Sequence, residues 1–151
     1  MRKRITLSLL TFSLCLSAVT AYSQAPAPPV KPALLVIDIQ NAFLPMIPAA
    51  DREAAMGHIN YYIATFRNHG FPVVLVYHHG EEYGVRPGTD LFEFPSSVLI
   101  KPDDPKIIKT YPDGFVKTDL DKVLKELGCN TLFLTGLSAV GCVLATYMGA
   151  Y

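Results

Sequence analysis

The sequence of 151 residues lacks several features that mark particular classes of protein. It has no excess of charge of either sign, because 13 basic side chains are balanced by 13 acidic ones, and this excludes a strongly basic nucleic-acid binder as the default interpretation. Three cysteines are too few for a small disulfide-rich fold. Only 17% of the residues are charged and 50% are apolar, which favours one folded domain over disorder.

The common sequence signatures of several enzyme classes are also missing. The chain has no GxGxxG, no Walker loop, no CxxC pair and no HExxH, so nothing points directly to nucleotide or zinc-protease chemistry. His78 and His79 are adjacent, and adjacent side chains on a strand point to opposite faces. We therefore expect no metal site at this pair, and no cofactor.

The first 23 residues have the layout of a secretory signal peptide. Residues 2–4 are basic, residues 5–21 are uncharged and mostly apolar, and small residues follow at Ala21 and Ser23. We expect cleavage after one of these two residues and a periplasmic or secreted product; an uncleaved membrane anchor is the alternative. Residues 24–32 (QAPAPPVKP) predict an extended linker, which leaves 33–151 as the domain.

Loss of the leader removes three basic side chains, so the mature chain has a net charge of about −3. Such a chain offers no basic surface for nucleic acid. We expect a small-molecule substrate as its partner, no membrane contact after cleavage, and a homo-oligomer when the chain is full length.

Unbroken apolar runs predict the strands of the domain. Such runs are typical of parallel strands buried on both faces, and they occur at Ala33 to Ile39, Phe71 to Tyr77 and Thr131 to Thr135, with a shorter candidate at Lys106 to Lys109. Helical periodicity falls between or after them, at Asp51 to Asn68, Thr118 to Gly128 and Gly141 to Tyr151. This alternation predicts a layered α/β domain around a parallel sheet.

Two segments fit this plan poorly. Residues 78–105 contain no clear periodic element, which predicts either a functional loop, such as a lid or partner-binding arm, or a hidden short strand or helix. The sequence also ends within the helix predicted at Gly141 to Tyr151, so the strand at Thr131 to Thr135 is expected to have an uncovered edge. We interpret this as a C-terminal truncation.

Three chemically useful side chains fall at predicted strand ends, where sites form in open α/β sheets. Asp38 ends the first strand, Lys109 ends the short one, and Cys142 follows the last. A lysine and a helix start favour a thiolate, and a carboxylate can accept the thiol proton and return it to a leaving nitrogen. Each residue also has a plainer interpretation: a turn aspartate, a solvated lysine and a buried apolar cysteine.

Three blocks, in order, resemble the isochorismatase-like cysteine hydrolase superfamily, which includes nicotinamidases and N-carbamoylsarcosine amidohydrolases. They are Ala33 to Leu44 (ALLVIDIQNAFL), Ile108 to Leu120 (IKTYPDGFVKTDL) and Leu134 to Ala145 (LTGLSAVGCVLA). The resemblance implies a three-layer α/β/α sandwich, often dimeric or tetrameric. It also implies a hydrolase that cleaves the C–N bond of a small linear amide or carbamoyl compound through a cysteine thioester.

The resemblance also implies roles for individual residues. Asp38 would be the general base and acid, Lys109 its electrostatic partner and Cys142 the nucleophile. A cis peptide bond is implied between Leu137 and Ser138, with the N–H groups of Ser138 and Cys142 directed at the oxyanion. We assign substrate binding to Phe43 and Gln40, and we expect a Cys142 thiol with a pKa below 7.5, labelled by iodoacetamide much faster than Cys129.

Some positions depart from the family pattern. Asp113-Gly114 replaces the usual Ser-Ala pair and adds a carboxylate that either faces the pocket or points to solvent. The spaced metal ligands of nicotinamidases are missing, which disfavours that activity, whereas Cys142 favours C–N over vinyl-ether cleavage. A non-catalytic exported binding domain and an isochorismatase-type ether hydrolase remain as alternatives. We also expect Cys129 to be structural, and to lie too far from Cys142 for a disulfide.

Overall fold

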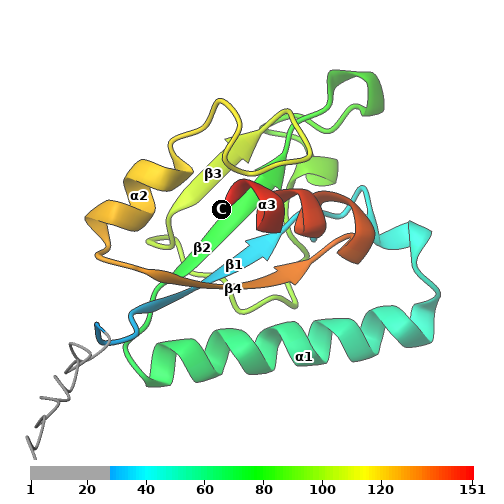
Figure 1. Cartoon of the computed structure of the whole chain (residues 1–151). Coiled ribbons are helices and arrows are strands. Elements are labelled where there is room, and N and C mark those ends of the chain that lie inside the picture. Colours follow the sequence, from blue (N-terminus) through cyan, green and yellow to red (C-terminus); the bar gives the residue numbers. More distant parts are fainter. Residues whose placement is uncertain (1–27) are drawn as a thin grey trace, which may run out of the picture.

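The computed structural model describes residues 28–151, which contain one sheet of four parallel strands in the order β3-β2-β1-β4 (Figure 1). The strands are β1 (Pro32–Ile37), β2 (Val73–His78), β3 (Lys106–Lys109) and β4 (Thr131–Gly136). The three predicted apolar runs and the short segment at Lys106 to Lys109 all form strands. The predicted signal peptide, and the linker up to residue 27, lie outside the described residues and stay predictions.

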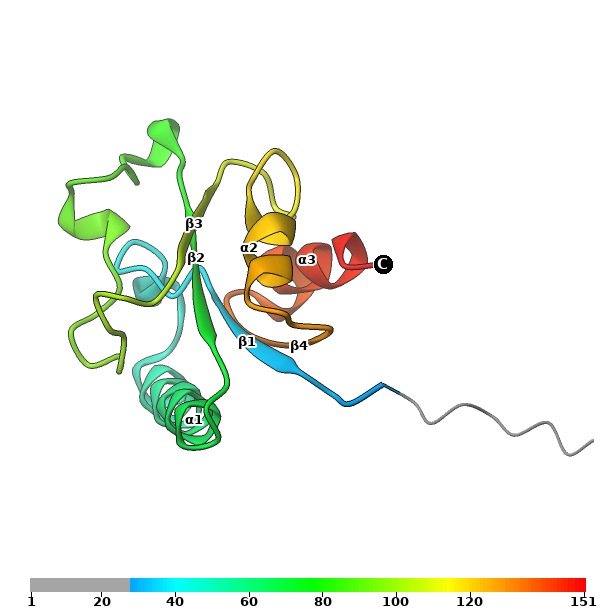
Figure 2. The same ribbon diagram turned by 90° about the vertical axis from the view of Figure 1, so that its left-hand side faces the viewer.

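Helices cover both faces of the sheet (Figure 2). Helix α1 (Ala49–Asn68) lies on one face, and α2 (Leu120–Glu126) and α3 (Leu144–Gly149) lie on the other. Two apolar clusters correspond to the two faces, one between the sheet and α1 and the other between the sheet and α2. The α/β/α sandwich predicted from the sequence is confirmed.

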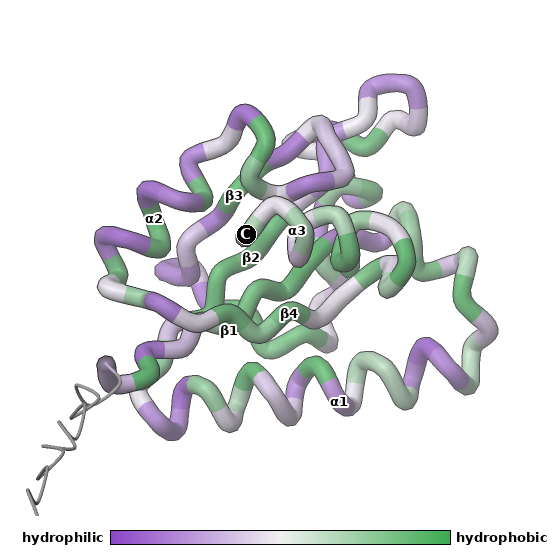
Figure 3. The backbone as a smooth tube through the Cα atoms, in the orientation of Figure 1, coloured by the Kyte–Doolittle hydropathy of each residue, from purple (hydrophilic) through white to green (hydrophobic). Residues whose placement is uncertain are grey.

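The position of each strand in the sheet explains its sequence. Strands β1 and β2 each have neighbours on both sides and helices or loops over both faces, so all of β1 and all but the last residue of β2 are buried, and these strands are strongly apolar (Figure 3). Among the described residues, strand β4 pairs with β1 alone, and its Phe133 is 52% exposed. The uncovered edge expected at this strand is therefore present in the structure.

The long segment after β2 is ordered and packed. It contains two short 3₁₀ helices, η2 (Glu81–Tyr83) and η3 (Asp90–Phe92), so the alternative of hidden short elements is correct. Phe92 and Phe94 stack on the buried Tyr77 ring, with ring centres 5.0 and 4.2 Å away. These aromatic contacts cover the part of this sheet face that helix α1 does not reach.

The strand ends differ from the prediction at the edge where the site lies. Strand β1 ends at Ile37 rather than Ile39, because Asp38 adopts a left-handed conformation with φ of 54°. Such a conformation in a non-glycine residue is uncommon and often occurs at functional sites. The helix predicted from Gly141 likewise begins later: a wide π-type turn (Ala139–Val143) precedes α3.

Gly136 brings the ends of β1 and β4 into close contact. Its φ is +131°, and a Cβ atom at this position would overlap the backbone of Ile37. Only glycine fits this conformation and this approach. The segment that carries Leu137, Ser138 and Cys142 is thereby placed directly beside Asp38.

Within residues 28–151 no helix has the length and apolar character needed to cross a membrane.

Candidate active site

The three candidate catalytic residues meet at the carboxyl edge of the sheet. Asp38 follows β1, Lys109 is the last residue of β3, and Cys142 lies in the turn after β4. The Lys109 Nζ donates a hydrogen bond to Asp38 Oδ2 at 2.7 Å, and the two side chains are 0% and 4% exposed. A buried ion pair of this kind is costly to place in a core unless the geometry is good, so this pair suggests a function beyond stability.

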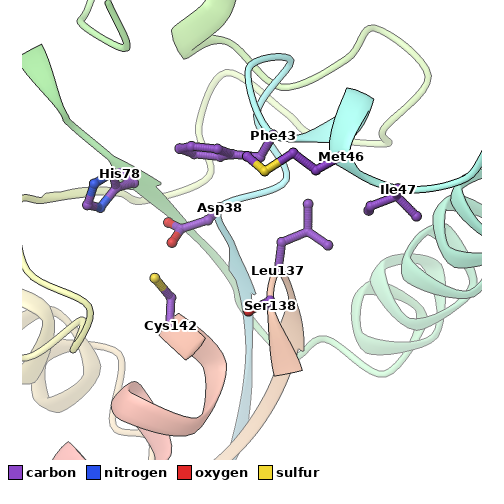
Figure 4. A pocket seen from close by; sticks show the side chains of 8 residues that line it. All are labelled: Asp38, Phe43, Met46, Ile47, His78, Leu137, Ser138 and Cys142. Atoms are coloured by element: carbon purple, nitrogen blue, oxygen red, sulfur yellow. The ribbon is translucent and has the colours of Figure 1, made fainter. Parts of the chain in front are cut away.

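Cys142 completes the group. Its sulfur is turned toward the Asp38 carboxylate, and both residues line one cavity (Figure 4). Asp38 Oδ1 is buried and has no hydrogen-bond partner among the residues that the structure describes. Because Lys109 already occupies Oδ2, Oδ1 is the oxygen that remains available to take a proton.

Burial controls the protonation of the acid and of the thiol. It raises the pKa of Asp38 above its ordinary value, and Lys109 opposes this rise without cancelling it. Burial and the nearby Asp38 charge raise the pKa of the Cys142 thiol, again against Lys109. The expected thiol pKa below 7.5 therefore disagrees with the structure, because the sequence showed the lysine but not the degree of burial.

This direction predicts how Cys142 reacts with iodoacetamide. The thiolate is the reactive form, so a raised thiol pKa leaves little of it at pH 7. We expect slow alkylation at pH 7 and a rate that still increases above pH 9, measured by mass spectrometry of the Cys142 peptide. A rate that levels off below pH 8 would show that Lys109 outweighs burial.

The cavity has a volume of about 360 Å³ and a mainly apolar wall. Phe43, Met46, Ile47 and Leu137 form the apolar part, and His78 and Ser138 add polar groups next to Asp38 and Cys142 (Figure 4). Phe43, to which substrate binding was assigned, is one of the lining residues, and its role stays a prediction. The Leu137–Ser138 peptide bond is cis, as the resemblance implied.

Gln40 does not line the cavity, in contrast to the assigned role in substrate binding. Its side chain is fully buried, and its amide is used twice by the backbone of His78. Gln40 Nε2 donates to the His78 carbonyl at 2.9 Å, and the His78 N–H donates to Gln40 Oε1 at 2.7 Å. Gln40 therefore joins the ends of β1 and β2 rather than facing a ligand.

Replacing Gln40 tests this structural role. Gln40→Ala leaves two half-buried backbone groups of His78 without these partners, at a cost of about 1 kcal/mol or more each. We expect a loss of at least about 2 kcal/mol in the free energy of unfolding, measured by urea denaturation. A loss below about 0.5 kcal/mol would contradict the double hydrogen bond.

The sequence did not single out His78, Met46 and Ile47 as site residues. His78 ends β2, so the strand-end rule that found Asp38 and Lys109 applied to it equally. Met46 and Ile47 belong to the short turn η1 (Leu44–Met46) and the residue after it, and their placement depends on how the chain leaves β1. No sequence pattern marks that path.

Two other predictions concern side chains near the site. Asp113 is not among the residues that line the cavity; its Oδ1 accepts the Phe115 N–H at 2.8 Å, and its carboxylate lies against Gly149 of α3. Cys129 and Cys142 are both free, as expected. Within residues 28–151, no three or more His, Cys, Asp or Glu side chains form a group suited to a metal ion.

Comparison with known proteins agrees with this fold. The isochorismatase domain family matches residues 32–151. The uncharacterized isochorismatase family protein YddQ of Bacillus subtilis (strain 168) is 34% identical over 123 residues, which cover 78% of this chain and 68% of that protein. A second relative from the same organism, YrdC, is 27% identical and is covered over 64% of its length.

Two similar solved structures have names that state an activity. N-carbamoylsarcosine amidase from Thermoplasma acidophilum has a TM-score of 0.70 and 31% identity, with coverage of 80% of this chain and 76% of the other. Pyrazinamidase of Pyrococcus horikoshii, solved in complex with zinc, has a TM-score of 0.68 and 26% identity, with 80% and 78% coverage. By fold, sequence and the extent of the match, this chain belongs to the isochorismatase family of hydrolases.

Proposed function

We propose that this protein hydrolyses the C–N bond of a small, uncharged amide or carbamoyl compound through a thioester on Cys142. The observation that carries the proposal is the position of the Asp38 carboxylate: Lys109 holds one oxygen, and the other, which has no hydrogen-bond partner within residues 28–151, lies on the side of the Cys142 thiol. A thiol with an adjacent base is the arrangement that nucleophilic catalysis requires. The amidase among the similar structures supports C–N cleavage.

The first half of the reaction forms the thioester. Asp38 accepts the thiol proton as the sulfur attacks the carbonyl carbon, and the backbone N–H groups of Ser138 and Cys142 stabilise the negative carbonyl oxygen. The C–N bond then breaks, and Asp38 returns its proton to the leaving nitrogen. The amine or ammonia departs with both electrons of the bond.

The second half regenerates the enzyme. Asp38 takes a proton from water, the hydroxide attacks the thioester carbonyl, and the C–S bond breaks. Asp38 protonates the thiolate, and the acid product leaves. Lys109 keeps its charge throughout and stabilises the ionised form of Asp38 between the two proton transfers.

The cavity restricts the substrate to a small molecule. About 360 Å³ accommodates a compact organic compound, and the apolar wall of Phe43, Met46, Ile47 and Leu137 favours an uncharged acyl group. Within the cavity the Asp38 charge is already neutralised by Lys109. An ionic substrate would therefore lose its hydration without gaining a free counter-charge.

A panel of small amides and carbamoyl compounds, followed by release of ammonia or amine, tests the proposal. We expect uncharged members to be hydrolysed and charged analogues of equal size to react at least tenfold more slowly. Isochorismate belongs in the same panel, because cleavage of isochorismate alone would replace this proposal with ether hydrolysis. Binding without turnover of any compound would favour the non-catalytic alternative.

A further inference from the structure

His78 lies in the active site, but the proposed reaction gives it no role. Its side chain lines the cavity, and its ring meets Phe43 edge-on with ring centres 6.0 Å apart (Figure 4). Its Nδ1 lies 3.3 Å from the Lys109 Nζ. His78 therefore contacts the same ammonium group that holds Asp38.

The chemistry of lysine fixes the direction of this hydrogen bond. An ammonium group has three N–H donors and no acceptor, and Lys109 is charged because it is paired with the buried Asp38 carboxylate. His78 Nδ1 must therefore accept, which places the ring proton of neutral His78 on Nε2. A protonated His78 would instead direct an N–H and a positive charge at Lys109.

The backbone of His78 is held in place for this contact. The Gln40 amide binds both its N–H and its carbonyl, and the parallel register places His78 opposite Lys109 on the neighbouring strand. Gly80 lies near the ring, where a Cβ atom would be 3.4 Å from Nε2 of His78, an ordinary van der Waals distance. These contacts fix the backbone of His78 beside Lys109, and the ring reaches the ammonium group from there.

We propose that neutral His78 is a positioning residue that holds the Lys109 ammonium against Asp38, and that protonation of His78 disrupts this arrangement. Lys109 is fully enclosed, so its N–H groups can bond only to the few acceptors around it. Loss of the Nδ1 acceptor leaves one N–H unpaired and weakens the hold on Asp38. The catalytic consequence rests on the proposed function, whereas the geometry does not.

The charges around His78 define the pH range of the effect. The titratable groups whose charges act on the ring are Lys109 on β3, Asp38 after β1, Glu82 in η2 and the neighbouring His79. Burial first, then Lys109 and to a smaller extent His79, lower the pKa of His78, while Asp38 and Glu82 oppose them. The pKa of Asp38 moves upward, toward that of His78. Protonation of either residue on the acidic side should therefore reduce activity.

The test compares the pH dependence of kcat/KM in the wild-type chain, His78→Asn and His78→Ala. The asparagine Oδ1 takes the place of Nδ1 as an acceptor and does not titrate. On the acidic side we expect log kcat/KM of the wild type to fall with a slope that approaches 2 per pH unit, and that of His78→Asn with a slope of 1. His78→Ala should be at least tenfold slower than His78→Asn at pH 8, while His79→Asn, the control next in the chain, should keep the wild-type slope.

Two results would overturn the proposal: equal rates for His78→Asn and His78→Ala, or a wild-type slope in His78→Asn. Nitrogen-15 NMR of the wild-type chain reports the tautomer and the pKa of the His78 ring and needs no substrate. The variant His78→Asn is used only to assign the signal. We expect the Nε2–H tautomer and a pKa below 6.5 for His78; an Nδ1–H tautomer would refute the contact. If the wild type hydrolyses no amide, the proposed function fails, and the tautomer still decides this inference.

Discussion

Cys142→Ala should abolish amide hydrolysis, with a loss of at least about 10³-fold in kcat, because no other group can form the thioester. The measurement is the release of ammonia or amine from the best substrate of the panel. The cavity loses one sulfur atom, and binding of the substrate should change little. Retention of more than a few per cent of wild-type activity would refute the nucleophile assignment.

Cys129→Ala is the matched control for this change. Cys129 is half-buried against the cluster between the sheet and α2, and its sulfur lies at hydrogen-bond distance from the backbone carbonyls of Pro32 and Leu127. We expect full kcat in this variant and a loss of about 1 kcal/mol in stability. Inactivation of both variants to the same extent would point to loss of fold instead of loss of chemistry.

Lys109→Met should have the largest effect on stability, because it leaves the buried Asp38 carboxylate without its counter-ion. Breaking a buried pair by removal of one partner costs about 3–5 kcal/mol, so we expect a loss of this size in the free energy of unfolding at pH 8, measured by urea denaturation. Lys106→Met, on the exposed side of the same strand, should cost less than about 1 kcal/mol. Equal effects of the two changes would contradict the role of the ion pair.

The pH dependence of the stability lost in Lys109→Met follows from the direction in which the pKa of Asp38 is shifted. Burial raises the pKa of Asp38, and removal of Lys109 raises it further. A raised carboxyl pKa in the folded state penalises the ionised form, so the penalty is largest at neutral pH and fades as the pH falls and the carboxyl takes up a proton. The difference between Lys109→Met and the wild type should therefore be smaller at pH 4.5 than at pH 8.

The sequence predicted the layers of the fold and the residues of the ion pair for a clear physical reason. Strands buried on both faces must be apolar throughout, so the acid that ends the first run lies at the sheet edge where sites form, and a lysine that ends the shorter predicted strand lies at the same edge. Asp38 and Lys109 were found in this way, and Cys142 from its place after the last run. In the structure Asp38 and Cys142 line one cavity, and Lys109 is hydrogen-bonded to Asp38.

The sequence could not predict what depends on long-range packing. The Gln40 side chain is hydrogen-bonded to the backbone of His78, 38 positions away. Its position two residues after Asp38 gave no sign that its amide would bind that backbone. The protonation of Cys142 was misjudged for a similar reason, because the degree of burial is a property of the assembled site. The parts of the cavity wall formed by Met46 and Ile47 depend on the path of the chain after β1. That path turns away from the strand at Asp38, which has a left-handed backbone conformation.

The thioester on Cys142 is the central claim, and trapping it is the most direct test. The wild-type protein is mixed with its best amide substrate, quenched in acid within the first turnover and digested, and the peptides are weighed by mass spectrometry. We predict one new species, the peptide containing Cys142 increased by the mass of the acyl group, and its disappearance when hydroxylamine is added before the quench. Turnover with no acyl group on this peptide, or with the group attached elsewhere, would contradict the account.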